Sequence, residues 1–289
     1  MFDRILVPLD GSPRAEAALP PLAWLARPES SEIILIRACG LRPVGAFEAA
    51  PLLPMHVDEA RAYLELTAAR LRADGHRVRT LVREGEAAES ILDAAAEEDA
   101  TLIAMSTHGR SGLARFVFGS VAEKVLRASP TPVMIFPAFS PPRRQPPQRI
   151  LVPLRNDETA RALVPAVVEL ARRNGDSRVI LLHVTDRGEQ PDPCAPFLQA
   201  VAASLASEGV EGGALVLDGD PACRILETAY AEDADLLVMA ARGRRSPSRW
   251  IFGGVTEKVL RAAGPPLLIV RDAPVSRFIT SAKSAAWKE

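Results

Sequence analysis

Short, uninterrupted apolar runs alternate along the chain with longer stretches that mix apolar and polar positions. Runs that are apolar on both faces predict buried strands at residues 4–9, 32–38, 78–82, 101–105 and 132–136. The mixed stretches between them predict helices at residues 13–27, 58–74, 87–99 and 120–128. Strands and helices that alternate at this rhythm indicate right-handed crossovers and one parallel sheet, which is an α/β fold.

Proline marks two uncertain stretches in this pattern. The helix at residues 13–27, which we expect Ser12 to cap, contains Pro20 and Pro21. A proline inside a helix costs about 3 kcal/mol, so we expect a kink there and a second kink at Pro165, its counterpart later in the chain. Residues 40–57 carry several prolines and glycines and predict a long loop.

The whole pattern then occurs a second time. The hexapeptide RILVPL stands at residues 4–9 and again at 149–154, and residues 85–127 align with 219–261 without a gap and with about half of the positions identical. Such similarity predicts an internal duplication of a complete domain. We therefore expect domains at residues 1–139 and 149–272, joined by a proline-rich linker at 140–148 and followed by a tail at 273–289.

Composition narrows the function classes. The 35 basic and 36 acidic residues nearly cancel, which gives no general attraction to nucleic acid or to an anionic membrane. No apolar run approaches the roughly 20 residues that span a bilayer, and the first residues lack the charge order of a signal peptide. The three cysteines show no metal-site or disulfide spacing, which favours a reducing, cytoplasmic setting.

The most informative loop runs from residue 106 to residue 120. It follows a predicted strand, contains Gly109 and Gly119, and ends at Ser120, which we expect to cap the next helix. Glycines allow backbone N–H groups to approach a ligand closely, and a helix start attracts anions, so the loop predicts a phosphate site. It is neither a P-loop nor a dinucleotide motif, since the nearest lysine, Lys124, comes a turn later on the helix.

Two polar residues are predicted to meet beside this loop. Asp10 follows the first strand and Ser106 ends the fourth, and ligands of open parallel sheets lie at such carboxyl ends where the winding reverses. Asp10 would accept a hydrogen bond from a ribose hydroxyl or an amino group, or alternatively serve only as a turn carboxylate. His108 has no nucleophile or carboxylate placed beside it by the sequence, which favours a ligand-contacting or structural role over catalysis. Arg110 would meet phosphate or stay solvated.

These residues together resemble a known family. The motifs VPLDGS at 7–12, GEAA at 85–88, MSTHG at 105–109, GSVAEKV at 119–125 and PTPVMI at 130–135 are similar to those of universal stress proteins, and the resemblance covers both repeats. It implies two Rossmann-like domains, each an open five-stranded parallel sheet of order 3-2-1-4-5 between helices, which pair through their fifth strands. In one subgroup of the family it also implies ATP bound at the loop after the fourth strand.

For the first repeat the resemblance implies a set of nucleotide contacts. Pro8 and Ala38 would flank the base, Asp10 would hold the ribose or the base edge, and Met105, Ser106, His108, Gly109 and Arg110 would line the loop. Gly119, Ser120 and Val121 would hold phosphates. The ligand would be ATP or a related adenine nucleotide, with or without Mg²⁺. Ser106 stands where the ATP-binding subgroup has its first glycine.

The second repeat departs further from that pattern. Arg155 stands in the place of Asp10, Ala240 in the place of Ser106, and Gly254 in the place of Ser120. We expect weak ATP binding there or none, and a role as the pairing partner of the first repeat. The resulting hypothesis is a stress-response regulatory or sensor module, with homodimerisation left open. The alternatives are a slow ATPase or adenylate-handling enzyme, and a nucleotide-free interaction module. No catalytic residue and no metal ligand is assigned.

Overall fold

The computed structural model describes residues 1–40, 53–107, 119–138, 144–155, 157–175, 177–185, 195–241 and 254–271. Its strands are β1 (Arg4–Pro8), β2 (Glu32–Cys39), β3 (Arg77–Glu84), β4 (Leu102–Ser106), β5 (Val133–Phe136), β6 (Arg149–Pro153), β7 (Arg178–Thr185), β8 (Gly212–Asp218), β9 (Leu236–Ala241) and β10 (Leu267–Arg271). Its helices are a 3₁₀ turn η1 (Ala15–Ala18), α1 (Leu22–Leu25), α2 (Leu53–Ala73), α3 (Ala87–Glu97), α4 (Ser120–Ala128), α5 (Asp157–Asn174), α6 (Ala195–Ser207), α7 (Pro221–Ala231) and α8 (Gly254–Ala262). Alternating strands and helices confirm the α/β class.

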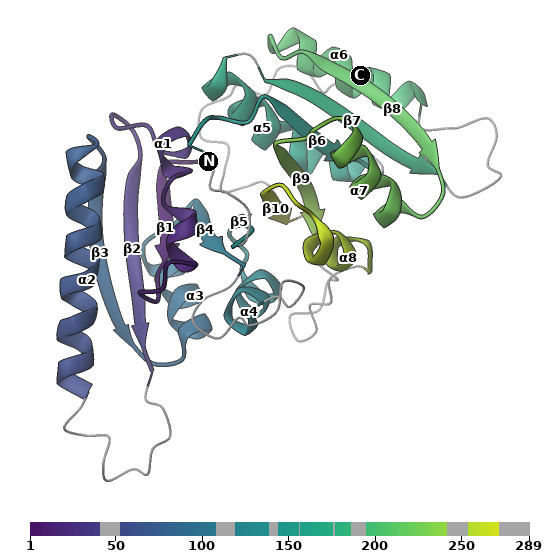
Figure 1. Ribbon diagram of the computed structural model, residues 1–289. Coiled ribbons are helices and arrows are strands. Elements are labelled where there is room, and N and C mark those ends of the chain that lie inside the picture. Colours follow the sequence, from purple (N-terminus) through teal and green to yellow (C-terminus); the bar gives the residue numbers. More distant parts are fainter. Residues whose placement is uncertain are drawn as a thin grey trace.

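The strands form one sheet in the order β3-β2-β1-β4-β5-β10-β9-β6-β7-β8. Each repeat thus contributes five parallel strands in the expected order 3-2-1-4-5, so the fold-class prediction is confirmed. The two halves meet where β5 pairs antiparallel with β10, with Met134 opposite Leu268 (Figure 1). This register is symmetric, since Ile135 faces Leu267 on one side of that pair and Val133 faces Ile269 on the other.

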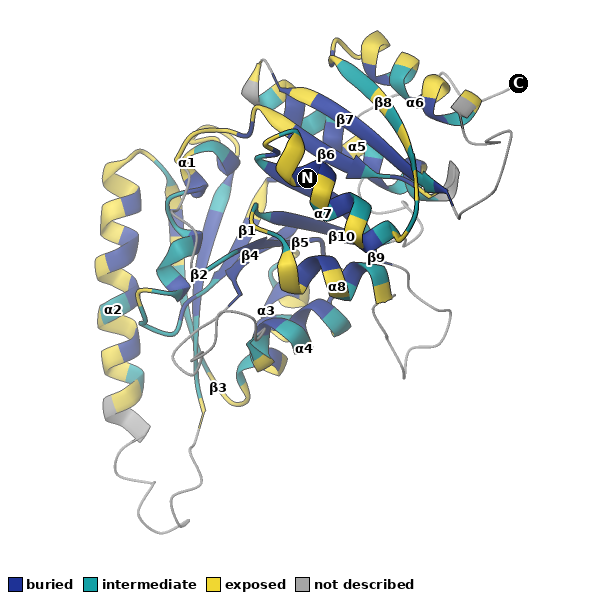
Figure 2. Ribbon diagram, turned by 45° about the vertical axis from the view of Figure 1, so that its right-hand side comes forward, coloured by how far each residue is buried: buried dark blue, intermediate teal, exposed yellow. Residues whose placement is uncertain are grey.

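Both faces of the sheet are covered by helices, which explains the uninterrupted apolar strands. Ile5 and Val7 of β1 lie in one core with η1, α1, α2, α5 and α6, while Leu6 lies in the other core with α3, α4, α7 and α8. Figure 2 shows the strands largely buried and the outer faces of the helices exposed. Because successive strand residues point to opposite faces, each strand supplies both cores.

The first predicted helix is wrong in its extent. Residues 13–27 form η1 and the four-residue α1 instead of one kinked helix, because Pro20 and Pro21 together remove two N–H donors and crowd the preceding turn. In the second repeat, by contrast, α5 runs continuously past its single Pro165.

Other predicted boundaries need smaller corrections. The helix α2 begins at Leu53, five residues earlier than expected, with Pro54 in its first turn, where a missing N–H costs nothing. The described part of the predicted linker, residues 144–148, has neither helix nor strand. The tail at 273–289 lies outside the described residues.

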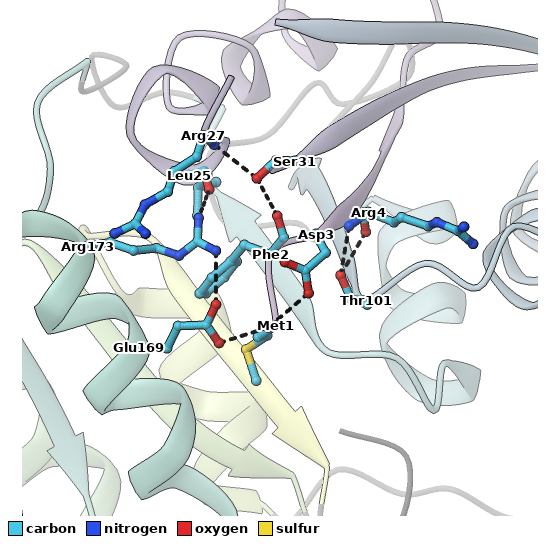
Figure 3. Close-up of polar contacts among 10 residues, drawn as sticks. All are labelled: Met1, Phe2, Asp3, Arg4, Leu25, Arg27, Ser31, Thr101, Glu169 and Arg173. Carbon is cyan, nitrogen blue, oxygen red and sulfur yellow. Dashed lines mark hydrogen bonds and ion pairs between the residues drawn. The ribbon is translucent and has the colours of Figure 1, made fainter. Parts of the chain in front are cut away.

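A polar cluster on α5 joins the two halves away from the β5–β10 pair (Figure 3). Arg173 donates to the Leu25 carbonyl at 3.0 Å and to Glu169 Oε1 at 3.0 Å, and its guanidinium carbon lies 4.8 Å from the centre of the Phe2 ring. The amino group of Met1 donates to Glu169 Oε2 at 2.8 Å. The Arg173 side chain is only 7% exposed, so these contacts are shielded from water.

Candidate functional site

A cavity of about 190 Å³ opens at the carboxyl ends of β1 and β4 in the first repeat. Its lining includes eight of the residues predicted from the sequence, which are Pro8, Asp10, Ala38, Met105, Ser106, Gly119, Ser120 and Val121. The remaining three predicted residues, His108, Gly109 and Arg110, lie outside the described part of the chain. The structure therefore brings together residues from four separate segments, at the ends of β1, β2 and β4 and at the start of α4.

The register of the sheet explains this convergence. The strand β1 pairs in parallel with β2 on one side and β4 on the other, with Pro8 opposite Ile36. The winding reverses between these neighbours, so the chain leaves β1 and β4 in opposite directions and leaves a crevice between them. Ser106, the last residue of β4, is buried at this edge.

Asp10 stands in a tight turn directly after β1. Its Oδ1 accepts from the Ser12 amide at 2.9 Å, and Gly11 between them has a φ of 83°. The Ser12 hydroxyl accepts from the Ala15 amide at 3.2 Å, but the N-cap of η1 is Arg14, so the prediction of Ser12 as the capping residue is wrong. The turn-carboxylate role considered for Asp10 is thus observed.

The first turn of α4 forms the opposite wall. Gly119 is the N-cap and Ser120 the first helical residue, without a side-chain cap, so the prediction of Ser120 as the capping residue is wrong. The Gly119 amide donates to the Thr107 carbonyl at 2.9 Å, which fixes the helix start against the end of β4. Ser120, Val121 and Ala122 line the cavity, so the first-turn N–H groups and the positive end of the helix dipole lie at its edge.

The floor of the cavity is apolar and was not found from the sequence. It consists of Leu9, Ala15, Ile36, Ala87 and Ile91, with Thr107 and Ala122 completing the lining. Ala87 and Ile91 are one helical turn apart on α3, so a four-residue spacing was the available signal, but it does not say which cavity the helix borders. A small apolar floor beside a polar rim suits a flat aromatic ring whose polar groups face outward.

Lys124 has a partner that keeps it away from this cavity. Glu86 caps α3 by accepting from the Ala88 amide at 2.9 Å and the Glu89 amide at 3.1 Å, and its other oxygen accepts from Lys124 Nζ at 3.0 Å. Burial opposes ionisation of Glu86, yet the hydrogen bonds from Lys124 and the two amides outweigh it and hold the pKa of this carboxyl below its usual value.

The second repeat has the same lysine contact, at 3.2 Å between Lys258 and Asp220, the cap of α7. Because the pair recurs beside the altered loop of that repeat, it serves helix packing and not a site specific to the first repeat.

The second repeat differs at the corresponding positions. The register places Val184 of β7 where the first repeat has Ala38, and Arg155 follows β6 where Asp10 follows β1. The buried His183 ring contacts the Leu154 carbonyl at 2.8 Å beside that turn. A larger residue and a cation thus replace the small residue and the carboxylate of the first cavity.

The described residues contain no group of three or more histidine, cysteine, aspartate or glutamate side chains that could hold a metal ion. Within the same ranges, none of the helices is long and apolar enough to cross a membrane.

Comparisons with known proteins agree with the duplicated architecture. The model of the universal stress protein family matches the chain twice, at residues 1–137 and 147–271. The universal stress protein Rv2623 of Mycobacterium tuberculosis is 26% identical over 93% of this chain and 96% of its own length. The single-repeat universal stress protein YxiE of Bacillus subtilis is 31% identical over 47% of this chain and 99% of its own length.

Among solved structures, a universal stress protein from Archaeoglobus fulgidus aligns with a TM-score of 0.80. It is 22% identical, and the alignment covers 94% of this chain and all of that one. At this identity the likeness establishes the fold alone.

Proposed function

The chain belongs to the universal stress protein family, and we propose that its first repeat binds ATP or a related adenine nucleotide and acts as a regulatory module. The observation that carries this proposal is the convergence of Asp10, Ala38, Ser106 and the first turn of α4 on one cavity. Asp10 supplies an acceptor for a hydroxyl or amino group, and Ala38 leaves space for a ring. Ser106 supplies backbone groups at the end of β4, and the first turn of α4 is a helix start that favours anions.

A different part of the cavity lining would contact each part of the nucleotide. The adenine ring would lie on the apolar floor between Pro8 and Ala38, and Asp10 would accept from the ribose. The phosphates would lie at Gly119, Ser120 and Val121, where N–H groups and the helix dipole favour negative charge. Mg²⁺ would arrive with the phosphates, since Asp10 is the one carboxylate among the described lining residues.

The volume of the cavity fits this division. About 190 Å³ is less than the roughly 300–1,000 Å³ of pockets that enclose a whole drug-sized ligand. The described walls would therefore enclose the base and sugar, with the phosphates along the helix start.

The second repeat would act as a partner and not as a second site. Arg155 replaces the carboxylate of Asp10, and Val184 fills the space that Ala38 leaves open, so one nucleotide per chain is expected. We further propose that residues 1–139 and 149–272 are the two folding units, that they stay paired through β5 and β10 in solution, and that the protein works in the cytoplasm. Because β5 and β10 are already paired with each other inside the chain, a homodimer would form through another surface.

Isothermal titration of the full chain with ATP, with and without Mg²⁺, tests the proposal. The variant Ala38→Leu fills the space for the base without removing a polar contact, and Val184→Leu is its matched control in the second repeat. We expect a stoichiometry near one for the unchanged chain and for Val184→Leu, and at least tenfold weaker binding for Ala38→Leu. A stoichiometry of two, or equal affinity of Ala38→Leu and the unchanged chain, would contradict it.

A further inference from the structure

A second and larger cavity, of about 690 Å³, lies at the junction of the two repeats. The first repeat contributes Ala17 and the end of β5, with Phe136 and Pro137. The second repeat contributes the C-terminal ends of α7 and α8 and the segment that leads into β10. Figure 2 shows α7 and α8 side by side with β5 and β10 next to them. We name this cavity the junction cleft.

Because the chain is duplicated, the junction cleft can be compared with the equivalent surface on the other side of the β5–β10 pair. The symmetric pairing of β5 with β10 relates each position near the junction to one about 134 residues later, and it relates Pro137 to Arg271. On the symmetry-related side, Arg271 Nη2 donates to the Leu126 carbonyl at 2.6 Å and also to the Arg127 carbonyl, in the last turn of α4. A guanidinium thus lies against a helix C-terminus there, and although burial lowers its pKa to about 10, it keeps its charge at neutral pH.

The junction cleft presents the same kind of surface without that arginine. Pro137, directly after β5, has no side-chain donor, so it cannot bind the end of α8 in the way that Arg271 binds the end of α4. Both α7 and α8 end at the cleft, and a helix C-terminus carries partial negative charge. The last carbonyls of α7 already accept from the amides of Glu232, Asp233 and Ala234, so the end that a ligand would meet is that of α8.

The described residues that line the cleft include no basic side chain. Asp233 is the one acidic side chain among them, and its charge is largely offset by Arg149, which lies 3.3 Å away and also donates to the Glu232 carbonyl at 3.2 Å.

The rest of the lining would suit the apolar stem of a cation. Phe136, Leu226 and Pro265 supply apolar walls. Tyr230 stands where the first repeat has Ala96, and it is 90% exposed, so its ring is accessible to a cation. Exposed aromatic rings beside negative potential are typical of sites that recognise organic cations.

We propose that the junction cleft is a binding site for an alkyl guanidinium, the group that an arginine side chain or a free guanidino compound carries. The guanidinium would lie at the end of α8, as that of Arg271 lies at the end of α4, and its stem would pack on Tyr230 and the apolar walls. A ligand here contacts both repeats, so its binding would depend on their relative position.

The proposal is tested by NMR titration of the full chain with N-acetyl-arginine methylamide, following backbone amides. The citrulline analogue has nearly the same shape without the charge and serves as the ligand control. We expect saturable shifts for amides of the junction cleft with the arginine probe and none with the citrulline analogue. A parallel titration with butylguanidinium separates the two sources, since equal affinity indicates a free guanidino compound and weaker affinity indicates an arginine in a peptide.

Two variants and a control variant keep the test independent of folding. Pro137→Arg places an arginine at the position equivalent to Arg271 and should occupy the cleft, with at least a tenfold loss of affinity. Tyr230→Ala changes an exposed side chain and should weaken binding about threefold, while Leu66→Ala, an exposed residue on α2, should have no effect. Absence of saturable shifts, equal shifts with the citrulline analogue, or full affinity of Pro137→Arg would overturn the proposal.

Discussion

Replacing Asp10 by asparagine separates the two roles of this residue. An asparagine oxygen still accepts from the Ser12 amide, so the turn after β1 stays intact, as in other Asx turns. The substitution removes the negative charge of the group that would accept a hydrogen bond from the nucleotide. The variant therefore tests the ligand contact with little effect on the fold.

The expected loss follows from the strength of one such contact. A hydrogen bond to a charged group contributes about 1.5–3 kcal/mol. Since about 1.4 kcal/mol corresponds to a factor of ten, Asp10→Asn should weaken ATP binding about 10-fold to 150-fold. The thermal midpoint should change little, because the Ser12 hydrogen bond remains.

The assay pairs a titration with ATP and a thermal melt of the same protein. Asp93→Asn, which changes an exposed carboxylate on α3, is the matched control and should alter neither quantity. If Asp10→Asn binds ATP within twofold of the unchanged chain, Asp10 is only a turn carboxylate and the assignment of the ribose contact fails. A large drop in the thermal midpoint would show instead that the turn depends on the charge.

Three further predictions concern stability, each measured by urea unfolding of the full chain. Arg173→Met should lower the free energy of unfolding by about 2 kcal/mol, which is less than the cost of about 3–5 kcal/mol for a fully buried pair because Glu169 is partly exposed. The control Arg172→Met, which removes a neighbouring surface cation, should cost under about 1 kcal/mol. Equal losses would refute the shielding of the α5 cluster. Because the pKa of Glu86 is lowered in the folded state, the stabilisation from its carboxylate is present at neutral pH and is lost as the pH falls through that pKa. Glu86→Gln should therefore lower the free energy of unfolding by about 1 kcal/mol at pH 7 and should make that free energy depend less on pH in the acid range. An unchanged dependence on pH in the acid range would refute this. Gly85→Ala should lower the free energy of unfolding by about 1–3 kcal/mol, because Gly85 has a φ of 134°, which a residue with a side chain rarely adopts. Gly254→Ala, at the open start of α8, should instead raise it by up to about 1 kcal/mol. The reverse order would contradict the backbone conformations described for these two glycines.

The sequence predicted the sheet well because its evidence is local. Uninterrupted apolar strands and a repeated hexapeptide determine strand type and duplication, and parallel crossovers have one hand. The helix at 13–27 was predicted wrongly because two adjacent prolines break a helix that one proline, as at Pro165, leaves continuous. The early start of α2 was missed because Pro54 favours a loop as readily as a first turn.

The candidate site shows the same division between local and spatial information. The sequence indicated the polar part of the lining, from Asp10 to Ser120, because these residues follow the two strands between which the winding of the sheet reverses. It did not identify Ala87 and Ile91 of the floor, because their role depends on how α3 packs against β2. The junction cleft depends on the pairing of β5 with β10. The family resemblance implied that pairing, but no local pattern in the sequence describes the cleft beside it.

The most direct test of one nucleotide per chain is native mass spectrometry of the full-length protein, as purified and after addition of excess ATP. The account predicts one added mass of an adenine nucleotide per chain, lost in Ala38→Leu and retained in Val184→Leu. No bound nucleotide in either sample, or two per chain, would contradict the central claim.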